Sequence, residues 1–170
     1  MSLLGIDIGT SGCKAVLFDE QGGMLYRAYR EYSVLRSRSG VAELEISTVE
    51  TAVMEVIREC ADHANTDSPM ALAVTSFGES CVPVTADGRA ACRCCILPED
   101  RRSKEATEAL IRQFSSDTMQ KRTGVRPASC HSLPLLAQQF QNSPELRERC
   151  AMLLDWSDYI AFRLTGEAAF

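Results

Sequence analysis

The residues best suited to chemistry in this sequence lie in its first fourteen positions. They form an acid, a Gly-hydroxyl-hydroxyl-Gly turn and a base: Asp7, Gly9, Thr10, Ser11, Gly12 and Lys14. Such a turn exposes backbone N–H groups and hydroxyls that suit phosphate oxygens. Asp7 cannot bind phosphate itself, because two anions repel, but its carboxylate can bind Mg²⁺, directly or through water, beside a substrate phosphate.

The spacing of the glycines separates this turn from the commoner phosphate loops. Gly5, Gly9 and Gly12 fit neither Gly-x-x-x-x-Gly-Lys-Ser/Thr nor Gly-x-Gly-x-x-Gly opening a helix. Residues 14–18 are short, β-prone and soon broken by a polar Gly-rich stretch, so they indicate a strand. Phosphate would then lie on a hairpin turn. An ordinary Gly-rich hairpin without a ligand is the alternative.

Composition describes an ordinary globular chain. The 170 residues are 45% hydrophobic and 24% charged, which is enough to bury a core. The net charge of −5 argues against a general nucleic-acid binder. No apolar run approaches the length of a membrane span, and the start lacks the features of a secretion signal. We therefore expect a cytoplasmic protein with neither nucleic acid nor membrane as partner.

Eight cysteines are many for this length. Five lie scattered in apolar surroundings, as buried thiols do: Cys13, Cys60, Cys81, Cys130 and Cys150. The cluster Cys92, Cys94 and Cys95 has no second Cys pair and no nearby histidine, so core thiols are favoured over a zinc site. His63 and His131 stand alone and are interpreted as structural or solvated.

The pattern along the chain predicts strands first and helices later. Strands are expected at residues 3–8, 14–18, 24–32, 70–77 (buried), 82–84 and 91–97, with an Asp-Gly hairpin turn at 86–89. Helices are expected from a capping box at 47–50 to residue 64, and at 103–114, 116–123, 133–141, after Ser143-Pro144, and 156–165. Residues 33–46 read as an irregular polar connection. This order indicates an α/β domain with a helical insertion.

Three stretches carry a resemblance to a known family. They are residues 5–11 with Lys14, residues 73–79 followed by 96–102, and Thr123-Gly124 followed by 158–167. In this order and spacing they resemble the N-terminal part of the FGGY family of carbohydrate kinases, the group that contains xylulokinase, gluconokinase and glycerol kinase. The first stretch alone would fit any actin-like ATPase.

The resemblance implies a ribonuclease H-like, actin-like α/β fold with a mixed sheet. Residues 1–170 would be the N-terminal domain, and family members carry a second domain, so the chain is expected to be a fragment. The implied activity is ATP-dependent phosphorylation of a sugar or polyol hydroxyl. The general-base aspartate is expected beyond residue 170, and the isolated fragment is expected to be inactive. An exposed apolar face would favour self-association, and a homodimer is the expected form.

The resemblance also assigns site residues. Asp7 matches the Mg²⁺-organising acid, and Gly9, Thr10, Ser11 and Lys14 match the positions that face ATP phosphates. On the sugar side the matching positions are Gly78, Glu79, Asp100 and Arg102. For the last two, a bracing ion pair stays as an alternative to substrate contact. Arg163 is expected to pair with an acid.

One departure from the family pattern concerns the substrate. Pro98 stands where the family usually has Trp, so the identity of the substrate cannot be inferred from that of any one family member. Two other classes stay open: a non-catalytic actin-like regulatory or assembly module, because fold does not fix function, and an actin-like ATPase that activates a redox enzyme.

Overall fold

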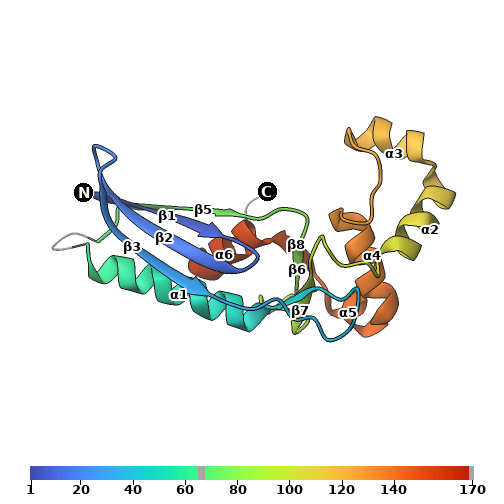
Figure 1. The fold of residues 1–170 in the computed structure, drawn as a ribbon, viewed down its shortest axis with the longest axis horizontal. Helices are drawn as coiled ribbons and strands as arrows, with labels where there is room; N and C mark the ends of the chain where they lie inside the picture. The colour runs from blue at the N-terminus through green and yellow to red at the C-terminus, as the bar shows by residue number, and fades with distance from the viewer. Residues whose placement is uncertain (65–67, 169–170) are drawn as a thin grey trace. The chain divides into compact units, whose positions relative to one another are not determined.

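The computed structural model describes residues 1–64 and 68–168, and it divides the chain into two compact units. Unit 1 comprises Met1–Val34, Glu45–Gly78 and Leu154–Phe170, and unit 2 comprises Leu35–Leu44 and Glu79–Leu153. Each unit is built from segments that are far apart in sequence, as the colours of Figure 1 show.

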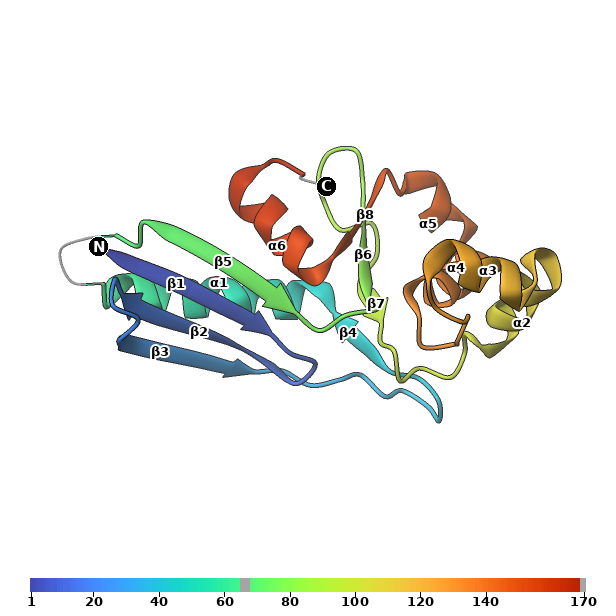
Figure 2. The same ribbon diagram turned by 90° about the horizontal axis from the view of Figure 1, so that it is seen from above.

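Unit 1 is built on a four-stranded mixed sheet. Its strands are β1 (Ser2–Ile8), β2 (Gly12–Asp19), β3 (Met24–Glu31) and β5 (Ala71–Ser76). Their order is β3-β2-β1-β5, and Figure 2 shows them side by side. The first three pair antiparallel, whereas β5 runs parallel to β1. The predicted three-stranded meander and the mixed sheet are confirmed.

Side chains alternate across this sheet, so that its two faces differ. In β1, Leu4, Ile6 and Ile8 are at most 3% exposed, whereas Asp7 between them is exposed. Helix α1 (Ile46–Asp62) covers the apolar face with residues that recur at helical spacing, namely Val49, Val53, Val56 and Cys60. The opposite face, with Asp7, is therefore the one that α1 leaves open.

Helix α6 (Trp156–Thr165) completes unit 1 and packs beside β5. Its Tyr159 hydroxyl donates to Glu50 Oε2 of α1 at 3.0 Å, and Arg163 Nη2 lies 2.9 Å from Glu50 Oε1. The expected acid partner of Arg163 is thus Glu50. Helix α6 begins and ends where the sequence predicts, with Gly166 in a left-handed conformation after its last residue.

Two predictions for unit 1 were wrong. The capping box does not form: α1 begins at Ile46 with Glu45 as N-cap and no side-chain cap bond, because Glu50 is drawn to Tyr159 and Arg163 instead. Strand β5 is not buried, since each of its residues is exposed or half-buried. The cause is its position at the end of the sheet, which an apolar sequence run does not reveal.

Unit 2 contains four helices among its described elements. Four short strands outside the four-stranded sheet form two further pairs. The helices are α2 (Lys104–Phe114), α3 (Ser116–Thr123), α4 (Ser132–Asn142) and α5 (Pro144–Arg149). The strands β4 (Glu43–Glu45) and β7 (Cys94–Ile96) pair with each other, as do β6 (Cys81–Val84) and β8 (Met152–Asp155). All four predicted helices are present, so the predicted helical insertion is confirmed.

The strand pairing differs from the sequence prediction. Residues 33–46 are not simply polar and irregular: they include β4, and Val41, Ala42 and Leu44 are buried. The turn at 86–89 does form, with Thr85 N–H donating to Arg89 O at 2.8 Å. However, β6 then pairs with β8, which the sequence did not predict, and β7 pairs with β4. Strands of three or four residues carry too little periodicity to predict their partners.

The cysteines are all free thiols. Cys13, Cys60 and Cys95 are buried, but Cys130 is exposed in the segment before α4, so the prediction of an apolar setting was wrong for it. Burial raises the pKa of the Cys92 thiol to about 12. The thiol is thus held protonated and donates to Cys94 O at 3.2 Å. Among the residues that the structure describes, no helix has the length and apolar character needed to cross a bilayer.

Candidate functional site

The turn between β1 and β2 presents unused hydrogen-bond donors. Gly9 N–H donates to Gly12 O at 2.9 Å, which closes the turn and leaves Thr10 and Ser11 exposed at its tip. Within the described parts of the chain, neither the N–H groups nor the hydroxyls of these two residues make a hydrogen bond. Two amides and two hydroxyls are therefore available to an anion, and donors grouped in a turn can bind anions such as phosphate.

Asp7 and Lys14 flank this turn from opposite strands. They are direct partners in the antiparallel ladder between β1 and β2, and both side chains are exposed. No ion pair joins them in the described chain, so each charge is available to a ligand. Thr75 of β5 lies opposite Asp7 on the other side. The open face of the sheet thus carries a base and an acid in one row.

Tyr32, which the sequence analysis did not single out, and Gly12 fix this turn. The Tyr32 hydroxyl donates to Gly9 O at 2.6 Å, and Tyr32 N–H donates to Ser11 O at 3.1 Å. A Cβ on Gly12 would lie 2.7 Å from Arg30 O, closer than such atoms approach. The tyrosine at the end of β3 carried no local signal of this role, because its partners lie more than twenty positions earlier in the chain.

Gly78 and Glu79 stand where the chain passes from unit 1 to unit 2, and both are exposed. A Cβ built on Gly78 would meet no atom within 4 Å. Glu79 has a φ of 66°, in the left-handed region that residues other than glycine rarely adopt. Its Oε2 accepts from Ser132 N–H at 2.6 Å and from Ser132 Oγ at 2.9 Å.

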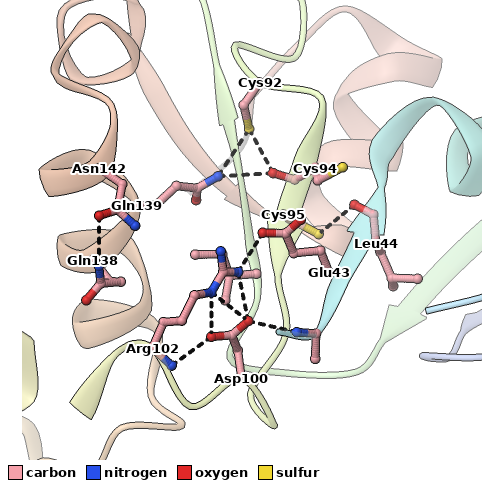
Figure 3. Close-up of polar contacts among 12 residues, drawn as sticks. Glu43, Leu44, Cys92, Cys94, Cys95, Asp100, Arg102, Gln138, Gln139 and Asn142 are labelled. Carbon is pink, nitrogen blue, oxygen red and sulfur yellow. Dashed lines mark hydrogen bonds and ion pairs between the residues drawn. The ribbon is translucent and has the colours of Figure 1, made fainter. Parts of the chain in front are cut away.

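Asp100 and Arg102 form a braced ion pair, drawn in Figure 3. Asp100 is 2% exposed, and its carboxylate accepts from the Arg102 guanidinium, from Arg102 N–H and from Ala42 N–H. Arg102 Nη2 also contacts Glu43 Oε1 at 2.5 Å. The network ties the loop after β7 to the segment that contains β4.

The charges of this network adjust the proton affinity of its members. Burial alone would raise the pKa of the Asp100 carboxyl, but hydrogen bonds from Arg102 and Ala42 N–H outweigh burial and hold the pKa below its ordinary value. Hydrogen bonding to Asp100 and Glu43 raises the pKa of Arg102. The pair is therefore charged at neutral pH, and all of its close partners belong to unit 2.

The predicted site residues fall into two groups. Asp7, Gly9, Thr10, Ser11 and Lys14 gather at one end of the unit 1 sheet. Gly78 ends a segment of unit 1, and the other acceptor-side residues belong to unit 2, where Asp100 and Arg102 are in contact. The structure assembles no group of three or more His, Cys, Asp or Glu side chains able to hold a metal, as far as its described residues extend.

Comparison with known proteins places this arrangement in a family. The family described as "FGGY family of carbohydrate kinases, N-terminal domain" matches residues 2–170. A xylulose kinase of Bacillus subtilis is 25% identical over 165 residues, which cover 96% of this chain and 33% of that protein. A glycerol kinase of Treponema denticola is 28% identical over 148 residues, which cover 85% of this chain and 30% of the relative.

Solved structures agree on the fold. A xylulose kinase from Rhodospirillum rubrum superimposes with a TM-score of 0.91 at 23% identity, over 99% of this chain and 35% of that one. A glycerol kinase from Plasmodium falciparum gives a TM-score of 0.87 at 18% identity, over 97% and 34%. The chain spans about a third of the length of the relatives that it matches.

The mixed sheet, its helices and its open hairpin turn define an actin-like ATPase fold, as expected from the sequence. Within that class, the chain belongs to the FGGY family of carbohydrate kinases and matches their N-terminal domain.

Proposed function

We propose that the protein transfers the γ-phosphoryl group of ATP to a hydroxyl of a sugar or polyol, and that residues 1–170 form the N-terminal domain that carries the phosphate turn. The observation that carries the proposal is the exposed turn tip, where Thr10 and Ser11 offer donors that the described protein does not use. Xylulose and glycerol kinases among the relatives support the class of acceptor.

On the nucleotide side, the turn would bind the terminal phosphates of ATP. Thr10 and Ser11 would donate to phosphate oxygens, and Lys14 would neutralise part of their charge. The exposed Asp7 carboxylate, which makes no ion pair in the described chain, suits Mg²⁺, because this ion is commonly held by one or two carboxylates together with phosphates. When bound, Mg²⁺ would neutralise charge that develops during transfer, and the protein would contribute mainly positioning.

On the acceptor side, Gly78 and Glu79 would contact the sugar or polyol. Glu79 is exposed and ionisable, and its Oε1 accepts no hydrogen bond from the described residues. For Asp100 and Arg102 we favour the bracing role, since the Asp100 carboxylate is already filled by protein donors and is 2% exposed. The general base would come from outside these 170 residues, in the manner that the family resemblance implies.

The test is a coupled assay of ADP release by the full-length protein with ATP, Mg²⁺ and a panel of sugars and polyols. Asp7→Ala should abolish turnover and leave the thermal unfolding temperature unchanged, because Asp7 is exposed. Asp62→Ala removes another exposed acid of unit 1, at the end of α1, and serves as control. Near-normal turnover of Asp7→Ala would refute the magnesium role, and no turnover with any acceptor would refute the kinase proposal.

The isolated chain of residues 1–170 should be inactive in the same assay, because the proposed base is not among its residues. Turnover by this chain alone would show that the base has been misplaced.

A further inference from the structure

Glu79 is held in place at two points, its backbone and its side chain. Its φ of 66° is a conformation that glycine would adopt without strain, so a side chain at this position calls for an explanation beyond the backbone. The next residue, Ser80, is 1% exposed and its hydroxyl donates to Ile96 O at 2.9 Å, which anchors the loop. The backbone that carries the Glu79 side chain is therefore anchored.

The two oxygens of the Glu79 carboxylate differ in their hydrogen bonding. Oε2 accepts two hydrogen bonds from Ser132, one from its N–H and one from its hydroxyl. Oε1 accepts none from the residues that the structure describes. Two donors on one oxygen restrict the rotation of the carboxylate, and the other oxygen keeps its lone pairs for a further donor.

Ser132 is the first residue of α4, which has eleven residues. Its N-cap, His131, makes no side-chain cap bond, so the N–H groups of the first turn need acceptors from elsewhere. Glu79, 53 positions earlier in the chain, supplies one, and its negative charge is favourable at the positive end of a helix dipole. Glu79 thus partly caps helix α4, and the same contact orients the Glu79 side chain.

We propose that Ser132 is a positioning residue for the acceptor site: it holds Oε2 of Glu79 so that Oε1 accepts a hydroxyl of the sugar or polyol. This inference rests on the proposed function. It predicts an effect of Ser132 on the KM for the acceptor, with little effect on the KM for ATP, because Ser132 acts only through Glu79.

The position of Ser132 allows both of its donors to be removed without breaking the helix. Proline is favoured at the first residue of a helix, where its missing N–H costs no intrahelical bond. The preceding His131 has φ −81° and ψ 153°, the extended conformation that a following proline requires. Ser132→Pro removes both donors, Ser132→Ala removes only the hydroxyl, and Ser132→Thr keeps both and is the matched control.

The experiment measures KM and kcat for acceptor and ATP in the full-length protein, together with thermal unfolding. Ser132→Pro should raise the acceptor KM by roughly threefold to tenfold, the range that corresponds to the net contribution of a typical hydrogen bond. Ser132→Ala should give a smaller rise, and Ser132→Thr should match the wild type. In a Glu79→Gln background, Ser132→Pro should have a much smaller effect, because the charged partner of Ser132 is gone.

Each outcome decides a different question. An unchanged acceptor KM in Ser132→Pro and Ser132→Ala, with normal wild-type transfer, would overturn the positioning role alone. Equal rises in the KM for ATP and acceptor would also overturn it, since they indicate a general structural effect. If Ser132→Pro does not fold, the acceptor KM of Ser132→Ala compared with that of Ser132→Thr tests the positioning role instead. Failure of the wild type to phosphorylate any acceptor would instead refute the proposed function.

Discussion

At the scale of single residues, the proposed chemistry depends on hydrogen-bond donors and acceptors that have no partner among the described residues. Thr10 and Ser11 have donors that no described residue uses, because the turn is closed by Gly9 and Gly12 and held by Tyr32. The resemblance assigned acceptor-contact positions to both Glu79 and Asp100, but their surroundings differ. Asp100 is buried and saturated, whereas Glu79 is exposed and half satisfied. On this difference in hydrogen bonding we propose a bracing role for Asp100 and a ligand contact for Glu79.

Gly12 should be required by the turn. In Gly12→Ala the new Cβ would lie 2.7 Å from Arg30 O, a backbone atom that cannot move without disturbing β3. We expect the free energy of unfolding in urea to fall by about 1–3 kcal/mol, the usual cost of overpacking. Gly78→Ala is the control, because no atom lies within 4 Å of its built Cβ. Equal stability of the two variants would argue against a constrained turn.

Arg102 should contribute more to the free energy of unfolding than an ordinary surface arginine does. Arg102→Ala leaves the buried Asp100 carboxylate without its cation, which commonly costs about 3–5 kcal/mol. Arg36→Ala breaks the exposed pair with Glu99 and should cost less than about 1 kcal/mol. Urea unfolding of both variants measures the difference. A loss in Arg102→Ala as small as in Arg36→Ala would refute the bracing role.

At the scale of elements, the sequence predicted well where the pattern was local. Helices α3 and α6 end at Gly124 and Gly166, both left-handed, as the glycines indicated. It failed where an element's environment is set by distant partners. The exposure of β5 depends on which strand ends the sheet, and the contact of Glu79 with Ser132 joins residues 53 positions apart. The turn between β1 and β2 was predictable because all its residues are contiguous, whereas the contact of Tyr32 with it was not.

The contact between α1 and α6 should make stability depend on alkaline pH. Burial, together with the charge of Glu50, raises the pKa of Tyr159 to about 12, whereas an unfolded tyrosine ionises near pH 10. Below pH 10 the contribution is fully present. Between about pH 10 and 12 only the unfolded chain loses this proton, so this group lowers the free energy of unfolding by about 1.4 kcal/mol per pH unit.

Denaturant unfolding of the wild type and Tyr159→Phe between pH 9 and pH 11.5 measures this contribution. Other titrating groups affect both proteins alike, so the difference between the two curves reports Tyr159. The wild type should lose stability more steeply than the variant as the pH rises. Parallel curves would mean that Tyr159 ionises equally well in the folded protein.

At the scale of the whole molecule, the chain returns to unit 1 after forming most of unit 2. Residues of unit 1 come from the start, the middle and the end of the sequence, so β5 pairs with β1, and α6 packs beside β5, only when distant segments meet. The nucleotide-side residues belong to unit 1, and Glu79 with its partner Ser132 belongs to unit 2. The residues that we propose for the nucleotide and most of those that we propose for the acceptor thus come from different units.

Strand β5 gives the chain a surface that should self-associate. It ends the sheet, contains no proline or charged residue, and is exposed or half-buried throughout, which are the features of an edge that pairs with another chain. Sedimentation velocity of residues 1–170 should therefore show association that increases with concentration. Ala73→Lys places a charge on the exposed strand and should weaken it, whereas Gln21→Lys adds the same charge on an exposed turn and should not. A monomer at every concentration, or equal effects of the two lysines, would show that β5 is not the contact.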